Sequence, residues 1–425
     1  MLKNKTAMKI IYLHQYFNTL EMSGGSRSFE MARRMVAEGH KVDVVTSLRD
    51  QNSSFKGWKS TSENGITVHW YCIKYSNHMT YAQRIIAFFQ FAFIATIKIM
   101  KIKGDIIFAT STPLTISIPA IFASKLKRIP MIFEVRDLWP EVPIAIGALK
   151  NPISKFLARS LEGWAYKHSD AIVALSLGMK EGVLARGYCL EKVAVIPNGS
   201  DIDMFKLIEC EAQEARSNRQ WLGSDPLLIY TGTVGRINGL SYLVELATKL
   251  LILKSNVKIL IVGDGLEVEQ VRIKAINCKV YEKNFFMEPM VPKNKIPPIL
   301  NAATIASNIV IDLPEARANS ANKFFDALAA KKPVFINHGG WLHDLVIAKN
   351  CGFSAWGFEI NDAAMKLDEL LNDPQWLAET SKNSSVLAKE YFDRDFLASC
   401  LLTVFSCVLE GRENQVHLSS FNTSQ

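Results

Sequence analysis

A repeated alternation of short apolar runs and helical segments is the feature that most constrains the fold of this chain. Each run is rich in Val and Ile and is followed by a glycine-containing or polar loop and then by a segment of helical periodicity. Such runs are typical of strands buried on both faces of a parallel sheet, so we predict an α/β protein with doubly wound sheets. The predicted strands are Ile10–His14, Val42–Thr46, Ile66–Tyr71, Ile106–Thr110, Met131–Val135, Ala171–Leu175, Val193–Pro197, Leu227–Thr231, Lys258–Val262, Ile305–Val310 and Pro333–Ile336.

The chain is too long for a single sheet of this kind. It has 425 residues, whereas single hydrophobic cores stop growing at roughly 250–300 residues. The alternation also restarts after the stretch IPNGSDIDMF. We therefore predict two Rossmann-like domains at 1–200 and 201–395, a helix at 396–411 that packs back on the first domain, and a polar, disordered tail at 412–425.

Charge and cysteine content narrow the class of partner. The formal net charge is +8, and the Lys and Arg residues are dispersed without a basic arm. This favours phosphate-bearing small molecules or an anionic membrane surface and argues against nucleic acid. Seven scattered cysteines without a C-x-x-C pair argue against a disulfide framework or a zinc site and for a reducing cytosol. The start, MLKNKTAMKIIYLHQYF, is a poor secretory signal because its apolar run is short.

One segment, Ile85–Met100, is almost entirely apolar. It is shorter than the ~20 residues of a membrane-spanning helix. We expect a buried helix that covers one face of a sheet. The alternative is a helix in the membrane interface, helped by Arg84 and by the cluster Lys98, Lys101 and Lys103, and the two interpretations are compatible on different faces.

Ligands of open α/β sheets bind outside the carboxyl ends of the strands, so the loops at those ends are the candidate sites. Gly24 and Gly25 precede a helix expected to begin at Ser26, whose free N–H groups favour an anion. An ordinary turn explains this glycine pair equally well.

The second half contains two glycine-rich turns between a strand and a helix. Backbone amides in such turns can cradle a diphosphate, with Arg236 as a nearby counter-charge. Two of them in one domain favour a nucleotide site over idle turns. The glycines are Gly232, Gly235 and Gly239 in the first turn, and Gly263 and Gly265 in the second.

The loop ARANSANKFFD offers the most specific pattern. We expect Ser320 to cap a helix and to place Asn322 and Lys323 in its first turn, where an anion is favoured. Asp326 then lies on the same face and can accept hydrogen bonds from ribose hydroxyls. The alternative is that Lys323 is solvated and that Asp326 only stabilises the helix.

Together these motifs resemble the GT-B retaining glycosyltransferases of the family 4 type, over about Met8 to Leu409. The resemblance is carried, in order, by HQYF…GGS, FEVRDLWPE, VIPNGSD, YTGTVGRINGL, VGDGLE and NSANKFFDALAAKKPV. The forms RDLWPE and NKFFD are most similar to the WbuB-like L-fucosamine transferases of bacterial surface polysaccharides. Such enzymes bind a nucleoside-diphosphate sugar with the C-terminal domain and the acceptor with the N-terminal one, and they are usually metal-independent.

The resemblance assigns roles to individual residues. Lys323 and the GTVGRING loop would meet the diphosphate, Asp326 the ribose, and Phe285–Pro289 with Phe286 the base. In FEVRDLWPE, Arg136 would neutralise a phosphate and Asp137 would orient a hydroxyl, unless an internal pair of Arg136 with Asp137 or Glu134 holds the loop. The implied catalytic residues are Arg136, Asp137, Lys323 and Arg236. The implied donor-binding residues are Gly24, Gly25, Gly232, Thr233, Gly235, Asn238, Gly239, Gly263, Gly265, Phe286, Glu315, Asn319, Ser320, Asn322 and Asp326.

The sequence departs from the family pattern at four positions. Arg136 stands where many members have a histidine after the fifth strand. Thr233 and Asn238 stand where many members have Arg and Lys in the phosphate loop. Ala318 stands at the first of two glutamates separated by seven residues, and Glu315 is a nearby substitute. Charge stabilisation then has to come from Arg236, Lys323 or Arg317.

The activity implied is retaining transfer of an N-acetylated or deoxy hexosyl group from a UDP-sugar, without a cofactor or metal. The acceptor would be a polyprenyl-diphosphate-linked saccharide in bacterial O-antigen, capsule or exopolysaccharide synthesis. The enzyme would be cytoplasmic and peripheral on the inner membrane. Two alternatives remain: a GT-B UDP-sugar epimerase, which needs no acceptor, and a non-catalytic scaffold, which the missing charges at Thr233, Asn238 and Ala318 favour.

Overall fold

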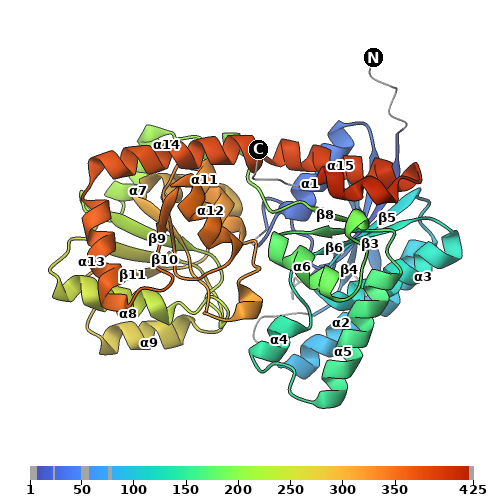
Figure 1. Ribbon diagram of the computed structural model, residues 1–425, viewed down its shortest axis with the longest axis horizontal. Coiled ribbons are helices and arrows are strands. Elements are labelled where there is room, and N and C mark those ends of the chain that lie inside the picture. The colour runs from blue at the N-terminus through green and yellow to red at the C-terminus, as the bar shows by residue number, and fades with distance from the viewer. Residues whose placement is uncertain (1–6, 23, 49–56, 75–78, 421–425) are drawn as a thin grey trace. The chain divides into compact units, whose positions relative to one another are not determined.

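The chain forms two compact units, each built on its own sheet (Figure 1). The computed structural model describes residues 7–22, 24–48, 57–74 and 79–420. The first unit comprises residues 1–19, 25–197 and 395–425, and the second comprises residues 20–24 and 198–394. The chain therefore passes between the units after Pro197 and again after Arg394, close to the ends of the two domains predicted from the sequence.

The first unit contains an eight-stranded sheet in the order β3-β4-β2-β1-β5-β6-β7-β8. All neighbouring strands are parallel except β3, which runs antiparallel to β4 at the edge. The strands are β1 Lys9–Leu13, β2 Lys41–Leu48, β3 Trp58–Glu63, β4 Ile66–Cys72, β5 Ile106–Thr110, β6 Met131–Val135, β7 Ala171–Ala174 and β8 Val193–Val195. The helices are α1 Arg27–Ala37, α2 Tyr81–Met100, α3 Ser117–Lys127, α4 Glu141–Ala145, α5 Pro152–Lys167, α6 Leu177–Ala185 and α15 Arg394–Leu409, with short 3₁₀ turns η1 Leu114–Ile116, η2 Leu190–Lys192 and η6 Glu413–Ser419.

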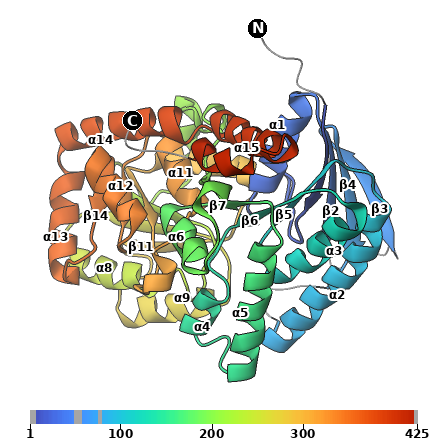
Figure 2. The ribbon, with the colours of Figure 1, turned by 45° about the vertical axis from the view of Figure 1, so that its right-hand side comes forward.

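The helices of this unit cover both faces of the sheet. Connections between parallel strands are right-handed, so the strand order places α1 on one face and α2, α3, α5 and α6 on the other. The views agree with this division (Figures 1 and 2). The long helix α15 returns to this unit, where the rings of Phe405 and Phe108 lie 5.2 Å apart.

The second unit contains a six-stranded parallel sheet in the order β11-β10-β9-β12-β13-β14. Its core is almost wholly apolar. The strands are β9 Leu227–Thr231, β10 Lys258–Val262, β11 Phe285–Glu288, β12 Ile305–Asn308, β13 Val334–Ile336 and β14 Gly352–Ser354. The helices are α7 Glu209–Ser217, α8 Ser241–Ile252, α9 Val268–Asn277, α10 Ile296–Ala302, α11 Asn322–Ala329, α12 Trp341–Lys349, α13 Ile360–Leu371 and α14 Pro374–Tyr391, with 3₁₀ turns η3 Asp203–Phe205, η4 Lys293–Lys295 and η5 Pro314–Ala316.

The predicted fold class is confirmed, because both sheets are doubly wound and Rossmann-like. Three strands, β3, β11 and β14, were not predicted. β3 is an exposed edge strand of sequence WKSTSE, and such a strand lacks the apolar run that marks a buried one. The prediction of a disordered tail was wrong as far as Ser420: Val416 in η6 is fully buried, and the Ser420 hydroxyl accepts a hydrogen bond from the Val195 amide at 2.8 Å.

Candidate functional site

The carboxyl edge of the second sheet has the geometry of a ligand-binding edge. From β9 the chain moves to β10 and β11 on one side, and β12 to β14 lie on the other side of β9. Loops that follow β9 and β12 therefore diverge at a topological switch point, where open α/β sheets bind ligands. These two loops touch, because the Ile311 amide donates to the Ile237 carbonyl oxygen at 2.8 Å.

The two glycine-rich turns pack directly on each other. A Cβ atom on Gly263 would lie 2.0 Å from the Gly232 carbonyl oxygen, and one on Gly265 would lie 2.2 Å from the Val234 carbonyl oxygen. Gly265 also has a φ of 156°, which favours glycine. Gly263 and Gly265 are therefore required by this close approach of two backbones, and a ligand is not needed to explain them.

Lys323 is the cation that these loops surround. Its Nζ donates to the Tyr230 hydroxyl at 2.9 Å and to Asn238 Oδ1 at 3.2 Å, and it lies 4.4 Å from the centre of the Tyr230 ring. The Tyr230 hydroxyl in turn donates to the Thr233 carbonyl oxygen at 2.7 Å. Lys323 is half-buried, and burial lowers its pKa to about 8. It is not the freely solvated charge of the alternative interpretation.

Other residues of the β9 loop complete the surroundings of this amine. A Cβ atom on Gly232 would lie 3.1 Å from Lys323 Cε, so glycine leaves room for the lysine side chain. Gly239 has a φ of 55° and would press a Cβ atom to 2.6 Å from Ile311 Cγ2. Gly235 is half-buried, and Arg236 is exposed beside it as a second cation.

The first turn of α11 differs from the prediction. The helix begins at Asn322, its N-cap residue is Ala321, and no side chain caps it. Ser320 is buried one residue earlier and binds Asn198 instead: its hydroxyl accepts from the Asn198 amide at 3.2 Å. The prediction that Ser320 caps the helix was wrong, because the chain turns into the helix one residue later.

Two amide oxygens near this turn are buried without a hydrogen-bond partner in the described part of the chain. They are Oδ1 of Asn319 and Oδ1 of Asn322. Buried acceptors are normally satisfied, so these two are available to hydroxyl or N–H donors of a ligand. The Asn319 backbone is itself held by Trp341, whose Nε1 donates to the Asn319 carbonyl oxygen at 2.7 Å.

Asp326 lies within the domain with both carboxylate oxygens engaged. Oδ1 accepts from the Ser200 hydroxyl at 2.9 Å, and Oδ2 is ion-paired with Lys293. Only 6% of the Asp326 side chain is exposed. A contact with ribose would require this carboxylate to share or exchange a partner, so the ribose role stays a prediction.

In the segment expected to bind the base, Phe285–Pro289, one aromatic ring is already stacked on another. Phe286 is buried in β11 and stacks on Trp221, with ring centroids 3.6 Å apart and an interplanar angle of 9°. Arg219 fastens this region through two bonds to the Glu288 carboxylate, at 2.7 and 2.6 Å. Glu315, the expected substitute for the missing glutamate, is half-buried in η5, and Ala318 is buried.

The carboxyl edge of the first sheet contains a buried ion pair. Arg27 donates from Nε and Nη2 to Glu134 Oε1 at 3.0 and 2.9 Å, and both side chains are at most 1% exposed. Arg27 also donates to the Pro197 and Ile196 carbonyl oxygens, and the Thr110 hydroxyl donates to Glu134 Oε2 at 2.6 Å. The alternative in which Glu134 pairs with Arg136 is excluded, because Arg27 of α1 takes that position.

Only part of FEVRDLWPE is free for chemistry. Glu141 is paired with Arg159 and Arg186 at 2.7–3.1 Å, and the Arg159 bond lowers the pKa of Glu141. Arg136 is half-buried and lies 3.4 Å from His14 Nε2 through Nη1, and Asp137 is exposed. Arg136 and Asp137 are thus the two charges of this stretch that stay at the strand end.

Gly24 and Gly25 are both exposed just before α1, which begins at Arg27 with Ser26 as its N-cap residue. Gly24 has a φ of 128°, and the Gly25 carbonyl oxygen accepts from Asn18 Nδ2 at 3.3 Å. The glycine pair therefore forms a turn at the start of a helix. Both the anion site and the ordinary turn considered from the sequence require this.

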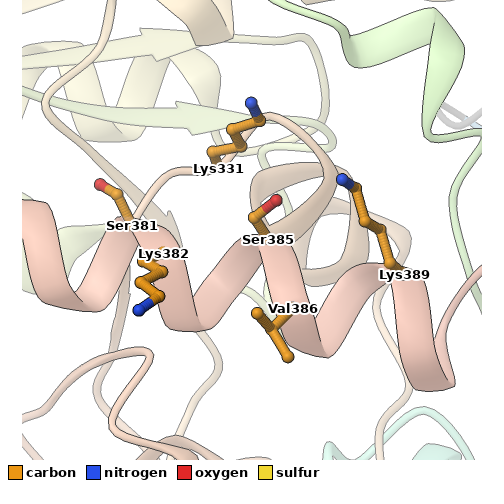
Figure 3. A pocket seen from close by; sticks show the side chains of 6 residues that line it. All are labelled: Lys331, Ser381, Lys382, Ser385, Val386 and Lys389. Atoms are coloured by element: carbon orange, nitrogen blue, oxygen red, sulfur yellow. The ribbon is translucent and has the colours of Figure 1, made fainter.

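A hollow of about 290 Å³ lies elsewhere in the second unit (Figure 3). It is lined by Lys331, Ser381, Lys382, Ser385, Val386 and Lys389. Lys331 lies between the end of α11 and the start of β13, so the hollow is at the amino edge of the sheet. Its lysines are exposed and solvated, and it is not a candidate for the site.

Among the described residues, no three His, Cys, Asp or Glu side chains gather to hold a metal ion. Metal-independence stays a prediction.

Several site residues were not found from the sequence. Tyr230 lies inside a predicted strand, and nothing in an apolar run marks one member as a partner for a lysine. Arg27 and Trp221 are also missed, because their partners Glu134 and Phe286 lie far away in the chain. The one available signal was Arg27, which follows GGS at the start of an expected helix. An arginine on the buried face of a helix seldom lacks a carboxylate partner.

Comparison with known proteins assigns both halves of the chain. The Glycosyl transferase 4-like domain matches residues 24–199, and the Glycosyl transferases group 1 domain matches residues 211–386. The Escherichia coli K12 protein WcaI, named as a glycosyl transferase of colanic acid biosynthesis, is 22% identical over 244 residues, which are 54% of this chain. The chain thus matches 60% of the length of that relative.

Solved structures resemble the whole chain. Anabaena Alr3699/HepE in complex with UDP-glucose matches 94% of this chain and 99% of its own, with a TM-score of 0.69 and 17% identity. Sucrose-phosphate synthase of Thermosynechococcus elongatus matches 95% and 100%, with a TM-score of 0.74 and 15% identity. At such identities the likeness shows a shared two-domain fold.

Proposed function

We propose that this chain, which belongs to the GT-B glycosyltransferases of the family 4 type, transfers a glycosyl group from a nucleoside-diphosphate sugar bound at the carboxyl edge of the second sheet. The observation that carries the proposal is the placement of Lys323. Its half-buried ammonium group lies against Tyr230 and Asn238, beside the glycine loop at the switch point. This is where a diphosphate would be bound by amides and one fixed positive charge.

The chemistry follows from that charge. Breaking a glycosyl–phosphate bond leaves negative charge on the departing diphosphate, and a positive group that is already in position stabilises it without reorganisation. Tyr230 and Asn238 hold the lysine amine in place before the donor binds. The exposed side chain of Arg236 can reach a phosphate of the bound donor. Its charge would then compensate for Thr233 and Asn238, which stand at positions that are charged in many family members.

We further propose the donor and acceptor classes. The donor is a UDP-sugar, which the UDP-glucose complex of the structural relative HepE supports, and the sugar is an N-acetylated or deoxy hexose. A role in polysaccharide synthesis is supported by the name of WcaI, and the acceptor is a polyprenyl-diphosphate-linked saccharide of a bacterial surface polysaccharide. Arg136 would contact a phosphate and Asp137 a hydroxyl, and the transfer would retain the anomeric configuration without metal.

Thermal unfolding with equal millimolar UDP, GDP, ADP or NAD tests the donor site. UDP at 100 times its Kd adds roughly 2.7 kcal/mol, which raises the midpoint by several degrees at roughly 2–4 °C per kcal/mol. We expect the rise with UDP, and its loss in Lys323→Ala but not in Lys366→Ala, an exposed lysine of α13. No rise with any nucleotide would support the scaffold alternative.

UDP release from UDP-sugars then distinguishes the two enzyme classes. A transferase releases UDP at a rate that rises with added polyprenyl-diphosphate-linked saccharide. An epimerase would instead convert the UDP-sugar without any acceptor, and that result would exclude the transferase.

A further inference from the structure

Helix α2 has two apolar faces. One face is buried in the first unit through Ala87, Phe91, Ala92, Ala95 and Ile99. The opposite face is exposed and mostly apolar, with Gln83 and Gln90 as its polar members. The exposed fractions of its apolar side chains are 66% for Ile86, 52% for Phe89, 68% for Phe93, 49% for Ile97 and 37% for Met100. The expected buried face is therefore confirmed, and the interfacial interpretation of the exposed face stays a prediction.

The neighbouring helices extend the apolar surface. α2, α3 and α5 follow one another on the same face of the sheet, and Figures 1 and 2 show them side by side. The rings of Phe122 in α3 and Trp164 in α5 are in contact at 6.0 Å. We call the exposed apolar side chains of these helices the α2–α3–α5 surface: Ile85, Ile86, Phe89, Phe93, Ile97, Met100, Phe122, Leu126, Ile153, Phe156 and Leu157. Exposed apolar side chains gathered on neighbouring helices are typical of a contact surface.

The exposed charged side chains on the three helices of this surface are basic. Neither α2 nor α3 contains an Asp or Glu, and the single carboxylate of α5, Glu162, is 2% exposed. Exposed Lys101, Lys103 and Lys125 lie at its margin. Lys98 was expected in this group but does not belong to it, because its Nζ lies 5.4 Å from the centre of the Trp58 ring. An apolar face with a basic margin is complementary to an anionic lipid bilayer.

The fold argues against a membrane-spanning α2. By length and composition, Ala82–Met100 is the one candidate membrane span among the described residues. However, α2 connects β4 to β5 within one sheet, and its second face is part of the domain core. A spanning α2 would therefore require the sheet to be taken apart.

We propose that the α2–α3–α5 surface docks the protein on a membrane that contains anionic phospholipids. The docked surface would also reach the candidate acceptor side of the first unit, because Phe88 of α2 contacts the Tyr16 ring at 6.3 Å in the loop after β1. The proposal does not depend on transferase activity.

Flotation of the full chain with vesicles tests this proposal. We compare phosphatidylcholine vesicles with and without phosphatidylglycerol. The anionic vesicles should bind the protein, and Lys101→Ala with Lys125→Ala should weaken binding about fivefold for each lysine removed, since each basic residue near an anionic surface contributes about 1 kcal/mol. Lys366→Ala is the control, and equal binding to both vesicle types would overturn the proposal.

The contribution of the apolar side chains to vesicle binding is tested separately from that of the lysines. The combined variant Ile86→Ser, Phe93→Ser and Phe156→Ser should lose binding by about tenfold or more. Its matched control is Ile252→Ser with Ile347→Ser, exposed by 69% and 60% in the second unit. Unchanged binding of the combined variant would overturn the proposal. So would a wild-type protein that is dimeric in solution when only the combined variant is monomeric. UDP affinity, measured without vesicles, should be the same in all of these proteins, which separates this test from that of the donor site.

Discussion

The carboxyl edges of the two sheets both carry charged side chains, but they use them differently. In the first sheet, Arg27 and Glu134 are buried against each other and hold α1, β6 and the chain near Pro197 together. In the second sheet, Lys323 is half-buried, and its hydrogen-bond partners among the described residues are the neutral groups of Tyr230 and Asn238. The first edge thus neutralises Arg27 internally, whereas in the described part of the chain the second edge holds Lys323 without a carboxylate beside it.

The difference separates charges that serve stability from charges that serve binding. A buried ion pair with all its hydrogen bonds made has nothing left to offer a ligand. A desolvated ammonium group without a counter-ion is an electrostatic cost in the free protein, and an anionic ligand would relieve it. The candidate donor site is therefore placed at the second edge.

The largest effect is expected from breaking the internal pair. Arg27→Ala should lower the free energy of unfolding by about 3–5 kcal/mol, because it leaves Glu134 buried and unpaired. Arg159→Ala, which breaks an exposed pair with Glu141, should leave the free energy of unfolding nearly unchanged. Urea unfolding measures both, and equal losses would show that burial does not distinguish the two pairs.

A smaller effect is expected from separating the two glycine turns of the second edge. Gly263→Ala places a Cβ atom 2.0 Å from the Gly232 carbonyl oxygen and should cost about 1–3 kcal/mol of stability. The control is Gly163→Ala in α5, where a Cβ atom has no neighbour within 4 Å and helix propensity should improve. An unchanged unfolding midpoint for Gly263→Ala would refute the close packing of the turns.

The smallest effect is the pH dependence of stability that Lys323 produces. Its pKa is about 8 in the folded chain and 10.5 in the unfolded one, so between these values the unfolded chain binds the extra proton. The free energy of unfolding should therefore rise by about 1 kcal/mol from pH 7 to pH 9. Urea titrations at each pH should show this rise in the free energy of unfolding for wild type but not for Lys323→Met. If the free energy of unfolding depends on pH in the same way in both proteins, the lowered pKa is contradicted.

The sequence predicted the elements whose signals are local. Apolar runs located the buried strands, and glycines located the turns of the second edge. Pairings between distant residues were not predictable: Glu134 offered Arg136 as a neighbour, but the sheet brings Arg27 to it from 107 positions away. The same limit hid Tyr230 as the partner of Lys323 and Lys293 as the partner of Asp326. Exposure was equally inaccessible, because one apolar helix, α2, looks the same in sequence whether one face or both are buried.

The most direct test of the donor site is the calorimetric affinity for UDP of wild type, Lys323→Ala and Lys366→Ala at neutral pH. Losing a charged hydrogen-bonding group costs about 1.5–3 kcal/mol, so Lys323→Ala should bind UDP about 10- to 150-fold more weakly. Lys366→Ala should bind UDP as wild type does. Equal affinity in all three proteins would contradict the account, because the diphosphate would then lie away from Lys323.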